Sequence, residues 1–130
     1  MVKRIYLYLA LCLLVISCSN SGKLSVVSPD NNVKVNFELA ETQPVYSVNY
    51  KGREVILPSA MGFALKEIEA LSGNFSIAGS QTSTYDETWE QVWGEKQFIK
   101  NNYNELKIDL TGNDGNKQQM SIVFRVFNDG

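Results

Sequence analysis

The sequence predicts an all-β protein, an antiparallel β-sandwich. Apolar side chains recur with a period of two along most of the chain, and clusters of turn residues interrupt these runs. Alternation of this kind is typical of strands with one face in a core and the other in water. Short strands separated by turn signals about every eight to twelve residues favour a sandwich.

Four runs carry the strand pattern. Apolar and polar residues alternate over residues 33–39, 46–50 and 106–110, so each run is predicted to have one wet face. Residues 120–127 are apolar on both faces except at Ser121 and Arg125, which favours a central strand buried from both sides. Residues 64–71 have some helical character but are too few to predict a helix.

Turn-forming residues separate these runs. They cluster at residues 28–32, 51–52, 72–74 and 112–116. The run that ends at Phe127 continues into Asn128-Asp129-Gly130, a strong hairpin signal. A strongly apolar strand with an unpaired edge would tend to aggregate, so we expect a returning strand and a sandwich that is incomplete at its C-terminus.

The first 17 residues have the layout of a secretory signal peptide. Lys3 and Arg4 precede an apolar stretch at residues 5–16, and Ser17 and Cys18 follow it. Twelve residues rise only about 18 Å as a helix, too little to cross a hydrocarbon core of roughly 30 Å. Residues 15–18 resemble a bacterial lipobox, in which the cysteine is diacylated and becomes the mature N-terminus. The alternative is an ordinary cleaved signal with an incidental cysteine.

Cysteine usage favours the lipid anchor. Cys12 would be lost with the signal peptide, so Cys18 would be the single cysteine of the mature chain and could form no intramolecular disulfide. Two acyl chains on Cys18 would anchor the protein stably to membrane lipid. We expect an exported bacterial lipoprotein of the periplasm or outer membrane. Residues 18–22 would be a polar tether, and residues 23–130 a single sandwich domain.

Charge and composition exclude several classes of function. Removal of Lys3 and Arg4 leaves ten basic and 14 acidic residues, a formal net charge of -4, without a basic cluster that would bind nucleic acid. The absence of histidine excludes Ser-His-Asp catalysis and the usual zinc sites. Residues 109–115 lack the ligands of a calcium loop and the spacing of a phosphate loop. We therefore predict no catalytic residue and no metal ligand in this chain.

Residues 86–106 are the most distinctive segment, with two tryptophans, a tyrosine and five carboxylates in 21 residues. Strand periodicity would place Trp89, Gln91 and Trp93 on one face, before a bend at Gly94 and a second strand from about Gln97. The tryptophans fit a platform for sugar rings, the sandwich core or an interdomain seam. The candidate residues of this interdomain or sugar-facing surface are Asp86, Glu87, Trp89, Trp93, Glu95, Asn102, Tyr103, Asn104 and Glu105.

Four motifs resemble the beginning of a glycoside hydrolase family 97 protein. They are SPDNNVKVNFEL, YSVNYKGREVI, DETWEQVWGEK and NNYNEL, in this order, and the resemblance covers residues 23–130. It implies the N-terminal part of a larger super-sandwich of the galactose-mutarotase type. Proteins of this family are exported, calcium-dependent bacterial α-glucosidases or α-galactosidases, whose catalytic carboxylates lie in a downstream (β/α)8 barrel.

The resemblance implies a non-catalytic domain of an exported α-glycosidase of polysaccharide use. It would pack on a catalytic barrel in cis or in trans and would itself need no cofactor, since calcium belongs to the parent family. A second hypothesis is a stand-alone lipoprotein that binds α-linked oligosaccharides through Trp89 and Trp93. A third, an enzyme in its own right, requires two carboxylates about 5 to 9.5 Å apart.

Overall fold

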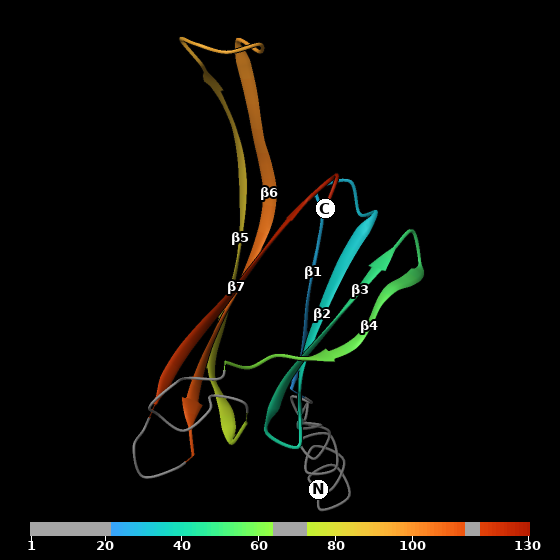
Figure 1. Cartoon of the computed structure of the whole chain (residues 1–130), viewed down its shortest axis with the longest axis vertical. Coiled ribbons are helices and arrows are strands. Elements are labelled where there is room, and N and C mark those ends of the chain that lie inside the picture. Colours follow the sequence, from blue (N-terminus) through green and yellow to red (C-terminus); the bar gives the residue numbers. More distant parts are fainter. Residues whose placement is uncertain (1–21, 64–72, 114–117) are drawn as a thin grey trace, which may run out of the picture.

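Seven β-strands run through residues 22–63, 73–113 and 118–130, which are the residues that the computed structural model describes (Figure 1). The strands are β1 (Lys23–Val27), β2 (Val33–Ala40), β3 (Gln43–Tyr50), β4 (Arg53–Ala60), β5 (Phe75–Glu90), β6 (Phe98–Gly112) and β7 (Gln119–Phe127). One antiparallel sheet has the order β1-β2-β3-β4, and the other has the order β5-β6-β7. The predicted antiparallel β-sandwich is confirmed.

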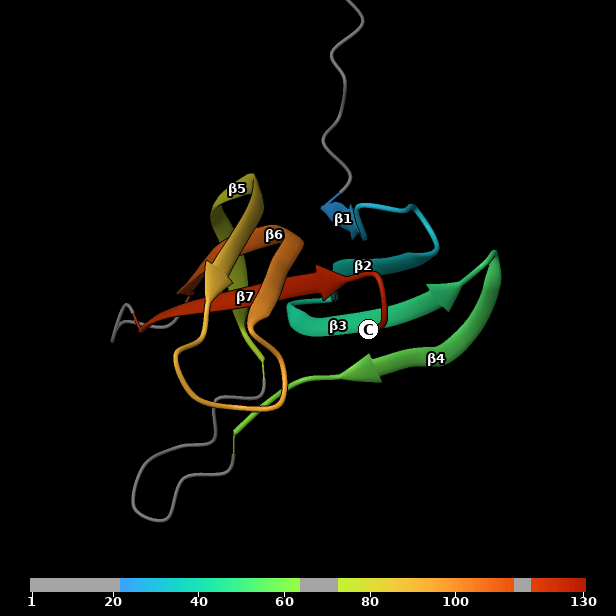
Figure 2. The ribbon, with the colours of Figure 1, turned by 90° about the horizontal axis from the view of Figure 1, so that it is seen from above.

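The core lies where β1 and β2 of the first sheet pack against β6 and β7 of the second. Its buried members alternate along their strands and are Val26, Val33, Val35, Phe37, Phe75, Leu106, Ile108, Leu110, Ile122 and Val126. Phe124 of β7 also reaches across, with its ring centroid 6.2 Å from those of both Phe37 and Tyr46. Figure 2 shows β7 leaving the direction of β5 and β6 and carrying its C-terminal end toward the first sheet. The strands predicted over residues 33–39, 46–50 and 106–110 are confirmed.

Two predicted turns adopt the geometry that their residues favour. Lys51 (φ 48°) and Gly52 (φ 79°) both lie in the left-handed region, as a two-residue hairpin of type I′ requires. At the end of β7, Phe127 and Gly130 exchange two backbone hydrogen bonds across the Asn128-Asp129 turn, of 3.2 and 3.4 Å. The cluster at residues 28–32 connects β1 to β2. The clusters at residues 72–74 and 112–116 fall partly outside the described residues.

The strand predicted over residues 120–127 is confirmed as β7, but the prediction that it is buried from both sides is wrong. Among the described residues β7 pairs only with β6, which makes it an edge strand, and its Val123 side chain is 45% exposed. On the outer face of β7, the Phe127 ring packs on the Tyr103 ring with centroids 4.9 Å apart. The apolar residues of β7 therefore make contacts on both faces of the strand. On the outer face the contact is with the neighbouring Tyr103 ring rather than with another layer of structure.

β5 and β6 are 16 and 15 residues long, well beyond the expected length, and their pairing continues past the sandwich (Figure 1). The predicted shared face of Trp89, Gln91 and Trp93 is wrong, because β5 ends at Glu90 and Trp93 lies in the connecting loop. The predicted second strand is confirmed and begins at Phe98. The predicted signal peptide with Cys18, most of the predicted tether and residues 64–71 lie outside the described residues.

Candidate functional site

The outer half of the β5–β6 hairpin projects beyond the sandwich, and we call residues 86–102 the arm (Figure 1). Its strands stay in one register from Gly79 opposite Asp109 to Glu90 opposite Phe98. Because directly opposed residues share a face, Glu87 and Trp89 lie on the outer face of the arm, whereas Asp86 lies on the face that continues the core side. An isolated two-stranded ribbon is marginally stable in water, so the arm needs support at its base.

That support comes from a group of side chains that we call the root. Its members are Tyr85, Tyr103, Asn104, Glu105, Arg125 and Phe127. The rings of Tyr85 and Tyr103 stack with centroids 4.8 Å apart and an interplanar angle of 22°, and Phe127 packs on Tyr103. Tyr103 is only 6% exposed, so this stack encloses its ring. Offset and tilted aromatic pairs of this kind add about 0.5–1.5 kcal/mol each beyond area burial.

Polar contacts complete the root. The guanidinium carbon of Arg125 lies 5.4 Å from the centroid of the Tyr103 ring, and its Nε donates to Glu105 Oε2 at 2.8 Å. The hydrogen bond to Glu105, with the charge of Tyr103 as a smaller cause, raises the pKa of Arg125 above its ordinary value. Asn104 Nδ2 donates to the backbone oxygen of Val27 at 2.8 Å, joining the arm's base to the end of β1. The root therefore connects the arm to both sheets.

The tip of the arm exposes four large apolar side chains. Trp89 is 49% exposed, Phe98 61%, Val92 84% and Trp93 85%. The prediction that both tryptophans could fill the sandwich core is therefore wrong. Trp89 lies opposite Ile99 and Phe98 lies opposite Glu90, so these two rings are on opposite faces of the arm, and a partner that covered both would have to enclose the tip.

Hydrogen bonds order the loop that carries two of these side chains. The backbone N–H of Gln91 donates to the oxygen of Gln97 at 2.7 Å, and Gln97 Nε2 donates to Glu90 Oε1 at 2.8 Å. The Gln91 side chain donates to the backbone oxygen of Trp93. Gly94 has φ 139°, a conformation that favours glycine, so the predicted bend lies where it was expected.

The structure divides the nine predicted surface residues into three groups. Tyr103, Asn104 and Glu105 belong to the root and hold the fold together. Asp86, Glu87, Trp89 and Asn102 lie along the strands of the arm, and Trp93 and Glu95 lie in its loop. Six of the nine predicted residues therefore lie on the arm, but they do not lie on one face of it.

The strands of the arm do not set two carboxylates directly opposite each other. Asp86 pairs with Asn102 and Glu87 pairs with Asn101, so neither faces another acid across the ladder. Glu90 shares a face with Asp86 but lies four residues further along β5. In the part of the chain that is described, no cluster of three or more acidic or cysteine side chains could hold a metal ion.

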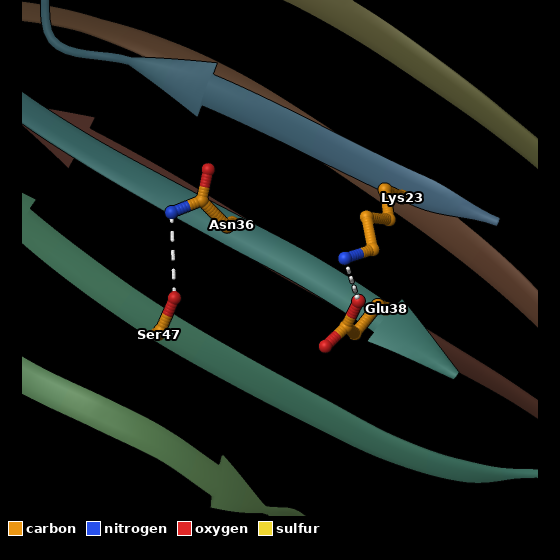
Figure 3. A network of polar contacts seen from close by, with 4 residues as sticks. All are labelled: Lys23, Asn36, Glu38 and Ser47. Carbon is orange, nitrogen blue, oxygen red and sulfur yellow. Dashed lines mark hydrogen bonds and ion pairs between the residues drawn. The ribbon is translucent and has the colours of Figure 1, made fainter. Parts of the chain in front are cut away.

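A second polar surface lies on the first sheet, away from the core (Figure 3). Lys23 Nζ lies 3.0 Å from Glu38 Oε2, and Asn36 Nδ2 donates to Ser47 Oγ at 3.3 Å and to Asn49 Oδ1 at 2.8 Å. All of these side chains except Asn49 line part of a groove of about 450 Å³. Much of their hydrogen-bonding capacity is spent on one another, so the groove is a weaker candidate for a binding site than the arm.

Sequence reasoning missed four residues of this region. Val92 and Phe98 belong to the exposed tip, and Arg125 and Phe127 belong to the root. Val92 and Phe98 could have been found from their positions beside the tryptophans. The other two come from a strand about 20 residues further along the chain, and only the pairing of β6 with β7 brings them to Tyr103.

The described residues thus form a β-sandwich from which an arm with exposed aromatic side chains projects. The family described as Glycosyl-hydrolase 97 N-terminal matches residues 26–130, and the chain belongs to this family. The resemblance seen in the sequence is therefore confirmed.

Solved structures agree with this assignment. A glycoside hydrolase family 97 enzyme from Pseudoalteromonas sp. strain K8, solved in complex with panose and in complex with acarbose, is 30% identical to this chain with a TM-score of 0.76. The match covers 81% of this chain and 16% of that enzyme. A β-arabinopyranosidase is 24% identical over the same shares, with a TM-score of 0.70, and this likeness shows the fold alone. The chain thus spans a small part of the enzymes that it matches.

Proposed function

We propose that this chain is a non-catalytic N-terminal domain of an exported α-glycosidase of polysaccharide use, and that its arm packs against a catalytic (β/α)8 barrel outside the chain. The observation that carries this proposal is the exposed apolar tip formed by Trp89, Val92, Trp93 and Phe98. Fully burying one such side chain contributes about 1.5–3 kcal/mol to the free energy of association. A partner that covered the tip would therefore gain most of its affinity from a few residues.

Two further observations support this role. Family 97 enzymes are much longer than this chain, which covers 16% of the Pseudoalteromonas enzyme, so most of such an enzyme lies outside the matched region. Across the ladder of the arm, Asp86 and Glu87 face asparagines rather than other acids, which fits a domain that supports chemistry performed elsewhere.

Binding in trans tests the proposal. The mature chain would be titrated calorimetrically into the catalytic part of a family 97 enzyme produced without its own N-terminal segment. The double variant Trp93→Ala/Phe98→Ala is expected to raise the Kd about 30-fold, the effect of losing about 2 kcal/mol at an interface. Val123→Ala is the matched control, because Val123 is an exposed apolar residue on the sheet, and it should change the Kd less than about twofold. Equal binding by the double variant and the parent chain would contradict the proposal.

Sugar binding is a second candidate, favoured by the exposure of both tryptophans. Stacking on an aromatic ring needs an accessible face, which Trp89 and Trp93 offer from different elements. Because the chain has only these two tryptophans, their fluorescence reports on the arm alone. Titration with maltotriose or an α-galactoside should shift the emission, and Trp89→Phe and Trp93→Phe would assign the shift. An unchanged spectrum at millimolar sugar would remove this candidate.

Export and anchoring rest on the signal-like N-terminus and on Cys18, which precede the described residues. We propose that Cys18 is diacylated and holds the protein to a membrane facing the periplasm or the cell exterior. Within the described ranges, no helix has the length and apolar character needed to span a bilayer. Cys18→Ala should move the protein from the membrane fraction to the soluble fraction, and a variant that stayed with the membrane would contradict lipidation.

We propose that the calcium expected of the parent enzyme binds in its catalytic part. Among the described residues no three or more acidic or cysteine side chains are grouped as ligands for a metal ion, which supports this assignment. Removal of calcium with a chelator should therefore leave the thermal unfolding midpoint of this chain unchanged. A fall in that midpoint, reversed by added calcium, would contradict the assignment.

A further inference from the structure

The groove on the outer face of the first sheet lies across β1, β2 and β3. Its side chains come from three neighbouring rows of the strand pairing, which are Lys23-Glu38-Val45, Ser25-Asn36-Ser47 and, beyond them, Lys34. Pro58 of β4 adds to the wall. The volume of about 450 Å³ falls within the range of about 300–1,000 Å³ that is usual for small-molecule sites.

Asn36 lies in the middle row of this groove with its side chain fixed. Its Nδ2 donates to Ser47 Oγ at 3.3 Å and to Asn49 Oδ1 at 2.8 Å, so both amide hydrogens are used. In Figure 3 its oxygen points away from Ser47, and no described residue donates a hydrogen bond to that oxygen. A ligand hydroxyl could therefore donate to Asn36 Oδ1 without any cost of ordering this side chain.

The ion pair beside Asn36 offers a donor and an acceptor next to each other. Lys23 Nζ lies 3.0 Å from Glu38 Oε2 (Figure 3). An ammonium group has three N–H donors and a carboxylate has two oxygens, so the pair leaves N–H groups of Lys23 and the Oε1 atom of Glu38 for a ligand. Because the two charges compensate each other, this part of the groove favours a neutral polar ligand over an ion.

The remaining side chains narrow the chemistry of the ligand. The hydroxyls of Ser25 and Ser47 lie on either side of Asn36 across the strands, and each can donate and accept. Val45 and Pro58 add apolar surface to the same groove. The matching ligand is uncharged, carries several hydroxyl groups and has apolar C–H faces. A saccharide combines these properties.

We propose that this groove binds an uncharged oligosaccharide at a site separate from the arm. Asn36 and Glu38 accept hydrogen bonds from its hydroxyls, Lys23 donates to them, and one ring packs on Val45 and Pro58. The groove is open and its polar groups are partly paired with one another, so we expect a Kd on the order of 1 mM. The site lies on the first sheet, so the inference does not depend on the arm binding a partner.

Amide NMR spectra of the isotope-labelled mature chain locate the site, with maltotriose and melibiose as the probes. Either sugar at millimolar concentration should shift the side-chain amide of Asn36 and the backbone amides of Ser25 and Ser47. Asn36→Ala and Glu38→Gln should each raise the Kd about fivefold or more, because each removes an acceptor of a ligand hydroxyl. Glu54→Gln is the matched control, since Glu54 lies on the same face outside the groove, and it should change the Kd less than about twofold.

The other outcomes would overturn the proposal in distinct ways. No shift with either sugar, or the same Kd for the parent chain and both groove variants, would remove the site. Shifts confined to the indole N–H groups of Trp89 and Trp93 would place sugar binding on the arm. Equal shifts with inorganic phosphate would make the groove an anion site. The variant Trp93→Ala/Phe98→Ala should leave the groove titration unchanged, and Asn36→Ala should bind the catalytic part like the parent chain, so failure here is separable from failure of the proposed function.

Discussion

The two halves of the β5–β6 hairpin share one hydrogen-bonded ladder but lie in different surroundings. In β6, Leu106, Ile108 and Leu110 are at most 1% exposed, whereas Phe98, at the other end of the same strand, is 61% exposed. The pairing itself does not change between them, since the register is continuous from Gly79 to Glu90. Burial therefore separates the part of the hairpin that stabilises this domain from the part that is available to a partner.

The root marks the border between these halves. Tyr103 is enclosed although it lies on the outer face of its sheet, because Tyr85, Phe127 and Arg125 surround it. Aromatic stacking and ion pairing here replace the second layer that covers the core strands. The comparison predicts a gradient of mutational effects from core to root to arm.

The largest effect is expected in the core. Ile108→Ala removes a side chain with 0% exposure and should lower the free energy of unfolding by about 3–4 kcal/mol, the transfer and cavity cost of such a deletion. Urea unfolding followed by circular dichroism measures it. Phe98→Ala at the tip is the control and should cost less than about 0.5 kcal/mol in the isolated chain. Similar losses for the two variants would remove the distinction between the halves.

An intermediate effect is expected at the root. Tyr103→Leu keeps part of the buried apolar area but loses the stacked pair with Tyr85 and the contact with the Arg125 guanidinium. The free energy of unfolding should fall by about 2 kcal/mol. Relative to the parent chain, amide exchange should accelerate more in the arm than in β2. Uniform acceleration across the whole chain would mean that the root does not support the arm separately.

A smaller effect is expected from the link between the arm's base and β1. Asn104→Ala removes the hydrogen bond to the backbone oxygen of Val27 and should lower the free energy of unfolding by about 1 kcal/mol. Asn102→Ala, two residues further out on the same face, serves as the comparison and should cost less than half as much. A larger loss for Asn102→Ala would place the border of the stable region further along the arm.

The smallest effect concerns pH and the exposed turn between β1 and β2. The hydrogen bond from Ser28 Oγ to Asp30, followed by the backbone N–H of Asn32, lowers the pKa of Asp30 below 3.8. A carboxyl whose pKa is lowered by folding stabilises the fold above its unfolded value of about 3.9, and this contribution is lost as pH falls through the folded value. Asp30→Asn should therefore flatten the pH dependence of the unfolding midpoint below about pH 4. If the slope of the unfolding midpoint against pH did not change, the pH dependence would come from other carboxyl groups.

Much of the sandwich could be predicted from the sequence, because its core strands show one buried face each. β4 and the part of β5 that precedes the tryptophan-rich run were not predicted as strands, and the structure gives the reason. β4 is exposed at most positions and contains Pro58, and β5 runs through serines and threonines that need no apolar alternation. The turn at Glu41 (φ 59°) and Thr42 (φ 138°) uses residues that are not typical of turns, so local preference could not indicate it.

Six of the nine predicted surface residues lie on the arm, but their arrangement on it differs from the predicted one. The tryptophan-rich run identified the arm because aromatic residues among carboxylates are unusual on a strand that needs only one apolar face. The faces of the run were assigned wrongly at Trp93, since nothing local shows that β5 ends at Glu90. The root was missed because Arg125 and Phe127 reach Tyr103 only through tertiary pairing.

The position of both tryptophans on the arm has a spectroscopic consequence. Trp89 and Trp93 are already 49% and 85% exposed in the folded domain, so their emission should be close to that of an unfolded chain. Denaturation followed by this emission would show little change while the core is lost, and would not coincide with denaturation followed by far-ultraviolet dichroism. That mismatch would imitate a folding intermediate even if the domain unfolded in a single step.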